Sequence, residues 1–349
     1  MLTIVGDCDL RLFGMKPADR LSRQTANLRE LHLVAHASAV LSDDTVAWLV
    51  DHPGTVIASN GGRPLAVAVG AAEVDAARNT IEGEKGLTVT KADAIGPVYV
   101  RKLRRTLMPL ALALGEQPRR VVERKLFASV YKGVTDLVTK YAWPEPALWL
   151  TRGAAALGLS PNAVTIVGLI LTFVAGWQFY VGNVGIGIAA AWLMTLLDTV
   201  DGKLARVTLT SSWLGNQLDH GNDLIHPPLW WYCLAHGISL ANPGHSWTWL
   251  SCWIILATYV IGRVLERGFK KQFGINPFMW KPFDSRFRTI VSRRNIILLM
   301  MTAGLIVGRP AEAFAACAAW SVVSVLIQGI RYVQAVGYSR REPISAWLG

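Results

Sequence analysis

The sequence has few cysteines and few charged residues, and each shortage excludes a class of protein. Four cysteines are spread over 349 residues without a Cys-x-x-Cys pair, which argues against a zinc site and against a disulfide framework. Only 17% of the residues are charged, below the value of about a quarter that is typical of soluble domains. Residues Met1 to Asp9 lack the basic start and apolar core of a cleaved signal peptide, so we expect internal segments to insert the chain into a membrane.

Positive charge predominates, with a formal net charge of +11. Such a surplus favours nucleic acid, a membrane surface or an anionic substrate as the partner. Because 52% of the residues are hydrophobic and gather in long runs, we predict membrane lipids and an anionic substrate, and no nucleic acid.

The hydrophobic residues are distributed unevenly along the chain. Before about Ala142 the sequence is mixed and charged, whereas after Leu157 it contains long uncharged apolar runs. This shift predicts a small soluble α/β domain followed by an α-helical integral membrane domain with six transmembrane helices. We place the α/β domain at 1–120, a basic linker with an interfacial helix at 121–160, the six-helix domain at 161–335 and a cytoplasmic tail at 336–349.

Short apolar runs and turn residues carry the α/β prediction. Asn60-Gly61-Gly62 lies between two runs of strand length and predicts a hairpin. The expected strands are Leu31–Ala35, Val56–Ala58 and Leu65–Val69, and the expected helices are Asp43–Val50, Ala71–Ile81 and Arg119–Lys140.

Six apolar segments follow, and the first, Asn162–Tyr180, has about the 20 residues that cross a bilayer. Lysine and arginine gather in alternate loops, above all between Arg263 and Arg294. By the positive-inside rule this places both termini in the cytoplasm. We expect the membrane to be the bacterial inner membrane. The remaining expected spans are Val184–Leu197, Leu224–Leu240, Trp247–Leu265, the short Ile296–Val307 and Phe314–Ile330.

Four aspartates lie at the ends of two of these spans. Asp198 and Asp201 stand three residues apart and share a helix face, and Asp219 and Asp223, four apart, share another. Two antiparallel helices would bring both pairs together, where the carboxylates repel one another unless cations neutralise them. Two Mg²⁺ or Mn²⁺ ions suit such oxygen ligands, and paired ions suit phosphoryl chemistry.

Small and basic residues surround these aspartates. Gly202, Ala205 and Gly215 leave room for a ligand close to the helices, and Lys203 and Arg206 offer charge for a diphosphate.

The pattern Asp198-x-x-Asp201-Gly202-x-x-Ala205-Arg206, followed by Gly215, Asp219 and Asp223, resembles the complete signature of the CDP-alcohol phosphotransferase family. The segment Leu159–Thr165 is similar to the element that opens the family's first span, and the resemblance covers roughly Trp149 to Arg331.

The resemblance implies a metal-dependent enzyme of the EC 2.7.8 type that moves a phosphoalcohol, with phosphatidyl favoured, from a CDP-alcohol donor to a hydroxyl acceptor and releases CMP. It implies that Asp198, Asp201, Asp219 and Asp223 bind two divalent ions and that Asp223 is also the base for the acceptor hydroxyl. The cytidine pocket would be lined by Asn162, Thr165, Gly202, Ala205 and Gly215. We favour CDP-diacylglycerol as the donor, because the site lies at the membrane, and we expect a homodimer. CDP-inositol remains an alternative donor.

The acceptor is not identified by this pattern: inositol phosphate, glycerol phosphate and a lipid hydroxyl all stay open. The basic stretch up to Arg294 fits three roles, namely fixing topology, binding anionic lipids, or binding a phosphate on the acceptor. Arg293 and Arg294 are the candidates for a phosphate site. We expect His220 and His226 to be hydrogen-bonded or to lie at the membrane interface rather than to be catalytic.

The N-terminal segment Leu12–Leu21 is faintly similar to the nucleotide loop of the nucleotidyltransferase domains that some family members carry. The glycine-rich loop is missing, since only Gly14 stands there, so we expect a degenerate relative, with an unrelated α/β module as the alternative. A transporter and a membrane scaffold are the alternatives to an enzyme, and CMP release distinguishes both of them from it.

Overall fold

The computed structural model describes residues 1–26, 28, 30–84, 86–241, 243, 244 and 246–348, without the side chains of 214, 216 and 218–220. It divides into two compact units. The N-terminal unit comprises Met1–Gly133, Leu148–Ser160 and Lys203–Ser211, and the C-terminal unit comprises Val134–Ala147, Pro161–Gly202 and Ser212–Gly349.

A five-stranded mixed sheet forms the centre of the N-terminal unit. Its strand order is β1-β2-β5-β4-β6, with parallel pairs at the two edges, β1 with β2 and β4 with β6, and antiparallel pairs between them. The strands are β1 (Leu2–Val5), β2 (His32–His36), β4 (Thr55–Ala58), β5 (Pro64–Val69) and β6 (Thr88–Lys91). The predicted strands and the hairpin at Asn60-Gly61-Gly62 are confirmed.

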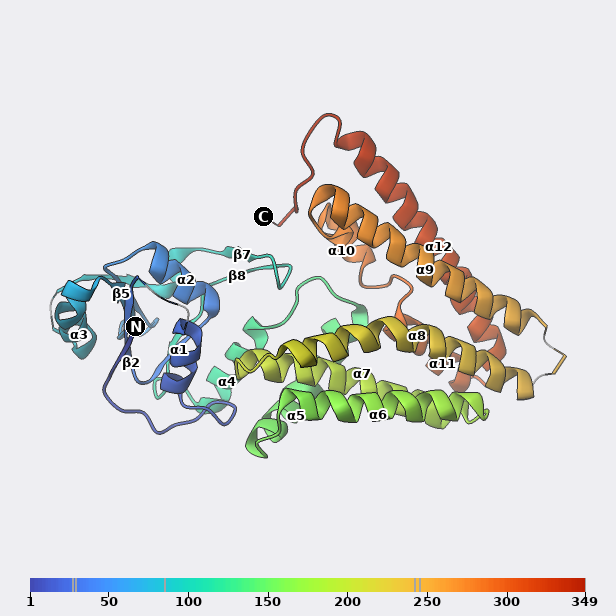
Figure 1. Ribbon diagram of the computed structural model, residues 1–349, viewed down its shortest axis with the longest axis horizontal. Helices are drawn as coiled ribbons and strands as arrows, with labels where there is room; N and C mark the ends of the chain where they lie inside the picture. Colours follow the sequence, from blue (N-terminus) through green and yellow to red (C-terminus); the bar gives the residue numbers. More distant parts are fainter. Residues whose placement is uncertain (27, 29, 85, 242, 245, 349) are drawn as a thin grey trace. The chain divides into compact units, whose positions relative to one another are not determined.

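Helices cover both faces of this sheet (Figure 1). On β2, Val34 packs toward Ala77 and Ile81 of α3 (Val74–Glu82), whereas its neighbours Leu33 and Ala35 pack with residues of α1 (Pro17–Thr25) and α2 (Asp43–Asp51). Burial on both faces explains why the strands are continuous apolar runs rather than alternating ones. The α/β prediction and the helices expected near residues 43–50 and 71–81 are confirmed, the latter after a 3₁₀ turn, η1 (Ala71–Glu73).

Shorter elements complete this part of the chain. Two small sheets pair β3 (Ala39–Leu41) with β9 (Ala111–Ala113) and β7 (Val98–Val100) with β8 (Arg105–Leu107). The helical elements are η2 (Ala92–Ile95), α4 (Arg119–Ser129), the π-helical turn η3 (Val138–Ala142) and α5 (Pro144–Ala156).

The helix expected over Arg119–Lys140 is wrong in its extent, because α4 ends at Ser129. Gly133 explains the break: it donates its N–H to the carbonyl of Leu103, and a Cβ there would lie 2.8 Å from the carbonyl oxygen of Arg104. A tertiary contact of this closeness overrides the local helical spacing.

Long helices make up most of the C-terminal unit. They are α6 (Pro161–Tyr180), α7 (Val184–Val207), α8 (Trp213–Ala241), α9 (Trp247–Phe273), α11 (Arg294–Ile306) and α12 (Pro310–Tyr338), with the short η4 (Pro277–Met279) and α10 (Pro282–Phe287) before α11. In Figure 1, α9 and α12 run side by side, as do α6 and α8. The core between the helices holds Phe179, Trp230, Trp231 and Phe314, all of them fully buried.

In the part of the chain that the structure describes, four helices are long and apolar enough to cross a membrane: α6, α7, α9 and α12. Their lengths of 20 to 29 residues correspond to about 30–44 Å, which reaches across the hydrocarbon core. The chain therefore combines an N-terminal α/β unit with a helical C-terminal part of the membrane type. The prediction of six spans depends on α8 and on α11, which has 13 residues.

A buried ion pair ties the segment before α11 to α12. Asp284 of α10, 5% exposed, accepts two hydrogen bonds from the guanidinium of Arg331, at 2.7 and 2.8 Å. The same guanidinium lies 4.3 Å from the ring centroid of Trp280. Because the carboxylate has a bidentate partner and almost no access to water, loss of that partner would leave an uncompensated charge.

We therefore expect Arg331→Ala to lower the free energy of unfolding by about 3–5 kcal/mol. Thermal unfolding of the detergent-solubilised protein measures this loss. Arg78→Ala is the matched control, because Arg78 pairs with Glu82 on an exposed helix face and should cost no more than about 0.5 kcal/mol. An equal effect of the two substitutions would contradict a structural role for the Asp284–Arg331 pair.

Candidate functional site

Three of the four predicted aspartates have described side chains, and two helices carry them. Asp198 and Asp201 lie near the end of α7, and Asp223 lies in the first half of α8. The side chain of Asp219 lies outside the described residues, so its role as a metal ligand stays a prediction.

Arg294, the first residue of α11, lies between the two carboxylate-bearing helices. Its Nη2 donates to Asp198 Oδ2 at 2.8 Å and its Nη1 donates to Asp223 Oδ1 at 2.9 Å. Nη1 also lies 3.2 Å from Nε2 of the buried His226, whose Nδ1 is 2.6 Å from the carbonyl oxygen of Asn222. One guanidinium thus brings Asp198 and Asp223 to a common positive charge, and His226 is hydrogen-bonded at both ring nitrogens, as expected.

Asp201 is held separately by α6. Its side chain is buried, and Thr165 donates its hydroxyl to Oδ2 at 2.7 Å. This contact links the two halves of the predicted site, since Thr165 comes from the segment that opens α6 and Asp201 from the motif on α7.

A second contact joins the start of α6 to the start of α8. Ser212 donates its hydroxyl to Asn162 Oδ1 at 3.0 Å and accepts the N–H of Gly215 at 3.0 Å, which is the geometry of an N-cap. A Cβ at position 215 would collide with Asn162 Oδ1, so the glycine is required by the close approach of this amide. The structure therefore brings the predicted residues Asn162 and Gly215 together.

Two consecutive prolines shape α8 directly after Asp223. Pro227 and Pro228 have no N–H, so the carbonyls of Asp223 and Leu224 lose their partners within the helix. The hydroxyl of Tyr259 on α9 lies 2.9 Å from the Leu224 oxygen and 3.4 Å from the Asp223 oxygen, and Arg263 Nη2 lies 3.5 Å from the latter. A neighbouring helix thus supplies the donors that α8 lacks beside its acidic residue.

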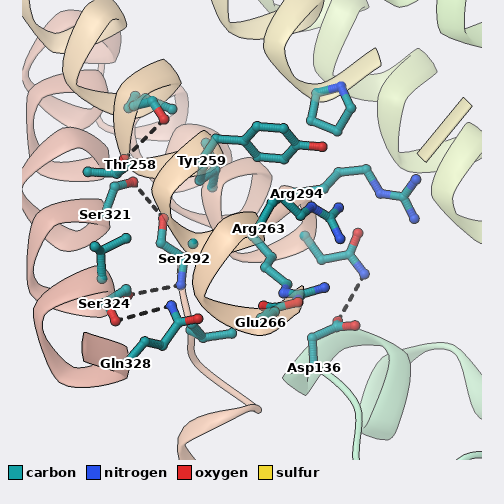
Figure 2. Close-up of a pocket in the computed structure, with 18 of the residues that line it drawn as sticks. Asp136, Thr258, Tyr259, Arg263, Glu266, Ser292, Arg294, Ser321, Ser324 and Gln328 are labelled. Carbon is teal, nitrogen blue, oxygen red and sulfur yellow. Dashed lines mark hydrogen bonds and ion pairs between the residues drawn. The ribbon is translucent and has the colours of Figure 1, made fainter. Parts of the chain in front are cut away.

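Asp223 is one of the residues that line a polar cavity of about 140 Å³. A cavity needs at least about 10–15 Å³ to hold one water, so this one has room for several waters or for a small polar molecule. Figure 2 shows side chains from several helices around it, Tyr259 and Arg263 among them. Its polar lining includes the hydroxyls of Thr258, Tyr259, Ser292, Ser321 and Ser324 and the amides of Asn295 and Gln328.

Four arginines and three carboxylates line this cavity, which leaves a surplus of positive charge. Arg293 forms an ion pair with Glu266 of α9, and Arg294 is engaged as described. The remaining charged groups are Arg263, Arg288, Asp136 and Asp223.

Asp136 fixes the start of α11. It accepts hydrogen bonds from Asn295 Nδ2 at 2.9 Å and from the N–H and hydroxyl of Thr139 at 3.0 and 2.8 Å. Burial alone would raise the pKa of the Asp136 carboxyl, but the charge of Arg288 and these hydrogen bonds outweigh it, so the pKa lies below its ordinary value. Asp136 is therefore charged at neutral pH and opposes the arginines of the cavity.

The other predicted residues lie on α7. Gly202 directly follows Asp201, and Ala205 and Arg206 lie in the last turn, within the N-terminal unit. Arg206 Nη1 donates to the carbonyl of Val130 at 3.3 Å, and the buried Lys203 donates to the same oxygen at 3.1 Å. A role for Gly202, Ala205 and Arg206 in donor binding stays a prediction.

Sequence reasoning missed several residues of the site. Ser212 had a usable signal, because a serine directly before a helix is a preferred N-cap. Asp136, Tyr259 and Glu266 had none, since each comes from a segment far in sequence from the motif.

The described side chains fit a hard divalent cation. Among the described side chains, which do not include that of Asp219, no group of three His, Cys, Asp or Glu forms a metal-binding arrangement. However, Asp198 and Asp223 already converge on one positive charge, that of Arg294, and they supply the oxygen donors that Mg²⁺ and Mn²⁺ prefer.

Residues 158–328 match the family model described as CDP-alcohol phosphatidyltransferase. The chain carries a CDP-alcohol phosphatidyltransferase domain. The predicted family is confirmed for this domain. The match begins at residue 158, so most of the N-terminal unit lies outside it, and its likeness to a nucleotidyltransferase stays a prediction.

Three curated proteins are similar over part of this domain. An archaetidylinositol phosphate synthase from Pyrococcus horikoshii is 37% identical over 78 residues, which are 22% of this chain and 40% of that protein. A phosphatidylinositol phosphate synthase from Mycobacterium marinum is 36% identical over 90 residues, 24% of this chain and 38% of that protein. Cholinephosphotransferase 1 from Danio rerio is 31% identical over 83 residues, 19% of this chain and 20% of that protein. The chain thus spans less than half the length of each of these relatives.

A solved structure is also similar, that of Mycobacterium tuberculosis phosphatidylinositol phosphate synthase with CDP-DAG bound. It is 19% identical with a TM-score of 0.42, covering 52% of this chain and 90% of that chain.

The hydrogen bonds that α8 lacks at Pro227 and Pro228 lead to a specific prediction about Tyr259. We expect Tyr259→Phe to reduce the free energy of unfolding by about 1 kcal/mol, because the carbonyl of Leu224 loses its hydrogen-bond donor. Pro228→Ala restores an N–H that can donate to that same carbonyl, so the double substitution should lose less than Tyr259→Phe alone. Thermal unfolding of the four proteins of this cycle measures the coupling.

Tyr232→Phe is the control, because Tyr232 lies on α8 and contacts Trp249 through its ring. Strictly additive effects of Tyr259→Phe and Pro228→Ala would show that the hydroxyl does not replace the missing helix hydrogen bond.

Proposed function

We propose that the chain transfers a phosphoalcohol from a CDP-linked donor to a hydroxyl acceptor and releases CMP, as a step of phospholipid biosynthesis. The observation that carries this proposal is the position of Asp223, a motif aspartate at the wall of a small polar cavity rich in arginine. The family domain supports a CDP-alcohol as the donor. The cavity supports an acceptor that is small, anionic and rich in hydroxyls.

The donor in this proposal is CDP-diacylglycerol. Asp198 and Asp201 lie near the end of α7, one of the four candidate membrane spans. A lipid donor can keep its acyl chains in the bilayer while its diphosphate reaches such a position. The names of two relatives, archaetidylinositol phosphate synthase and phosphatidylinositol phosphate synthase, also denote lipid products.

The acceptor in this proposal is a phosphorylated polyol of the inositol phosphate class. Hydroxyl and amide side chains line the cavity and match a polyol, and the surplus of positive charge matches a phosphate. Arg263, Arg288, Arg293 and Arg294 are the candidates for the phosphate contact. The names of the same two relatives support this class of acceptor.

Two divalent ions, Mg²⁺ or Mn²⁺, belong to the proposal, since the family generally uses divalent metal ions. Asp198, Asp201, Asp219 and Asp223 would hold them. When bound, the ions would neutralise the donor diphosphate and stabilise the charge on the departing CMP.

The residues of the chain then bind, orient and deprotonate the acceptor. The side chain of Asp223 is 48% exposed and lines the cavity, so its carboxylate can accept the proton of the acceptor hydroxyl. That oxygen attacks the β-phosphorus of the donor, and the bond from this phosphorus to the bridging oxygen breaks as CMP leaves. The arginines hold the acceptor in position, which supplies much of the rate in a reaction of this kind.

The membrane topology completes the proposal. With α8 and α11 also inside the bilayer, six helices span it and both termini lie on the cytoplasmic side of a bacterial inner membrane. The basic segment between Arg263 and Arg294 supports this orientation. A homodimer stays a prediction.

The test is CMP release by the purified full-length protein from CDP-diacylglycerol with Mn²⁺ or Mg²⁺. Inositol phosphate, inositol, glycerol 3-phosphate and buffer alone are compared as acceptors. We expect release with inositol phosphate, at least about 100-fold slower release by Asp223→Asn, and loss of activity on chelation. Asp44→Asn, in the N-terminal α/β unit, is the matched carboxylate control.

The alternatives give different results in this assay. Release from CDP-inositol but not from CDP-diacylglycerol would replace the lipid donor by a polar one. Release with glycerol 3-phosphate alone would replace the acceptor. No release from any donor, together with no metal-dependent binding of CDP, would refute the enzyme and favour a scaffold or a transporter.

The phosphate contact can be tested at Arg288. We expect Arg288→Gln to raise the KM for inositol phosphate about tenfold or more with little change in the KM for the donor, because one charge-assisted contact is lost. Arg286→Gln is the matched control, since Arg286 is exposed and does not line the cavity. Equal changes in both KM values would argue against a contact with the acceptor.

A further inference from the structure

The last turn of α7 is bonded by side chains of the N-terminal unit. The carbonyls at the end of a helix have no partner within it, and they carry the negative end of the helix dipole. Arg20 of α1 donates to the carbonyl of Val207, and Arg23 of the same helix donates to the carbonyl of Thr208 at 2.7 Å. Two arginines more than 180 residues away in sequence thus cap this helix.

The turn is also closed by its own main chain. Leu209 adopts a left-handed conformation with φ of 52°, and the N–H of Thr210 donates to the carbonyl of Ala205 at 3.0 Å. Such an end is a common helix stop. The capping arginines therefore act on a turn with a defined conformation.

Two cations of α7 make contacts in the opposite direction. Lys203 and Arg206 both donate to the carbonyl of Val130, which follows α4, and the Lys203 ammonium lies 3.5 Å from the ring centroid of Tyr131. Leu204 and Val207 between them are 1% and 2% exposed. The turn is thus enclosed on several sides by the unit that precedes the membrane helices in sequence.

The burial of Arg20 indicates that its contact with the end of α7 has a structural reason. Arg20 is only 4% exposed, and burying a guanidinium is costly unless its N–H groups meet acceptors. A methionine or leucine would fill the same volume without this cost. Arg20 Nη1 meets the carbonyl at the helix end, whereas its buried Nε has no hydrogen-bond partner among the described residues.

We propose that the N-terminal α/β unit is a clamp on α7, with Arg20 and Arg23 as positioning residues for the metal-binding aspartates. The inference rests on the proposed function of those aspartates. α7 is continuous from Val184 to Val207 and carries Asp198 and Asp201 directly before the clamped turn. Fixing that turn limits rotation and fraying of the helix at the aspartates, and reactions of this type depend steeply on position.

The test compares Arg20→Met, Arg20→Lys and Arg23→Ala in the full-length protein with Arg78→Ala as the control. Arg78 pairs with Glu82 on the exposed face of α3 in the same unit. Hydrogen exchange of the amides at 203–210 reports on the turn. CMP release as a function of Mn²⁺ reports on the aspartates through kcat and the half-saturating Mn²⁺ concentration.

We expect Arg20→Met to speed exchange in 203–210, lower kcat about tenfold and raise the half-saturating Mn²⁺ concentration, with the KM for the acceptor unchanged. Arg20→Lys should recover part of each effect, Arg23→Ala should show the same pattern more weakly, and Arg78→Ala should match the wild type. A reduced amount of correctly folded enzyme would lower the apparent kcat without moving the Mn²⁺ dependence, so it cannot imitate this result.

Other outcomes overturn the clamp. Faster exchange with an unchanged Mn²⁺ dependence would show a purely structural contact, and unchanged exchange in Arg23→Ala and Arg20→Lys would show that the turn does not need the arginines. If Arg20→Met does not fold, Arg23→Ala decides by the same criteria. If the wild type releases no CMP, the proposed function fails, and exchange with direct Mn²⁺ binding by electron paramagnetic resonance decides on the clamp alone.

Discussion

The guanidinium of Arg294 between Asp198 and Asp223 is the contact on which the arrangement of the site depends. Three helices meet there, α7, α8 and α11, and each contributes a charged group near the end of an apolar segment. Charges in such places are costly unless they are paired, so this pairing limits how the three helices can pack. Asp223 and Arg294 also line the arginine-rich cavity, so this ion pair connects the carboxylates to it.

Other main-chain groups near the site are also hydrogen-bonded by side chains of neighbouring segments. The prolines of α8 leave the carbonyls of Asp223 and Leu224 without donors inside the helix. Tyr259 and Arg263 of α9 lie within hydrogen-bond distance of these two oxygens. Ser212 caps α8 and at the same time holds the amide of Asn162. In each case the hydrogen bonds include one to a main-chain group close to a predicted functional side chain. The same bonds therefore stabilise the helices and position the side chains of the site.

The sequence allowed the α/β unit, the long apolar helices and the approach of Asp198 to Asp223 to be predicted, for reasons that can be named. Apolar runs with turn residues located the strands around residues 33, 57 and 66, and carboxylates at the ends of apolar segments located Asp198, Asp201 and Asp223. The helical spacing of 119–140 gave a wrong prediction, because the helix ends before Gly133. This glycine contacts the turn between β7 and β8, which lies far away in sequence. Local spacing also failed for Asp136 and Glu266, because their roles depend on Asn295 and Arg293, partners 159 and 27 residues away.

The N-terminal unit raises the question of why a membrane transferase domain should carry it. The family match begins at residue 158, yet the unit takes in the end of α7 at Lys203–Ser211, which lies inside the matched range and includes Ala205 and Arg206 of the motif. Within that unit, Arg20 and Arg23 of α1 donate to the carbonyls of Val207 and Thr208 at the end of α7. A domain whose role is mechanical would need such contacts, and would not need a glycine-rich phosphate loop. The missing glycine-rich loop around Gly14 and the buried Arg20 therefore both support the proposal that this unit positions the motif helix.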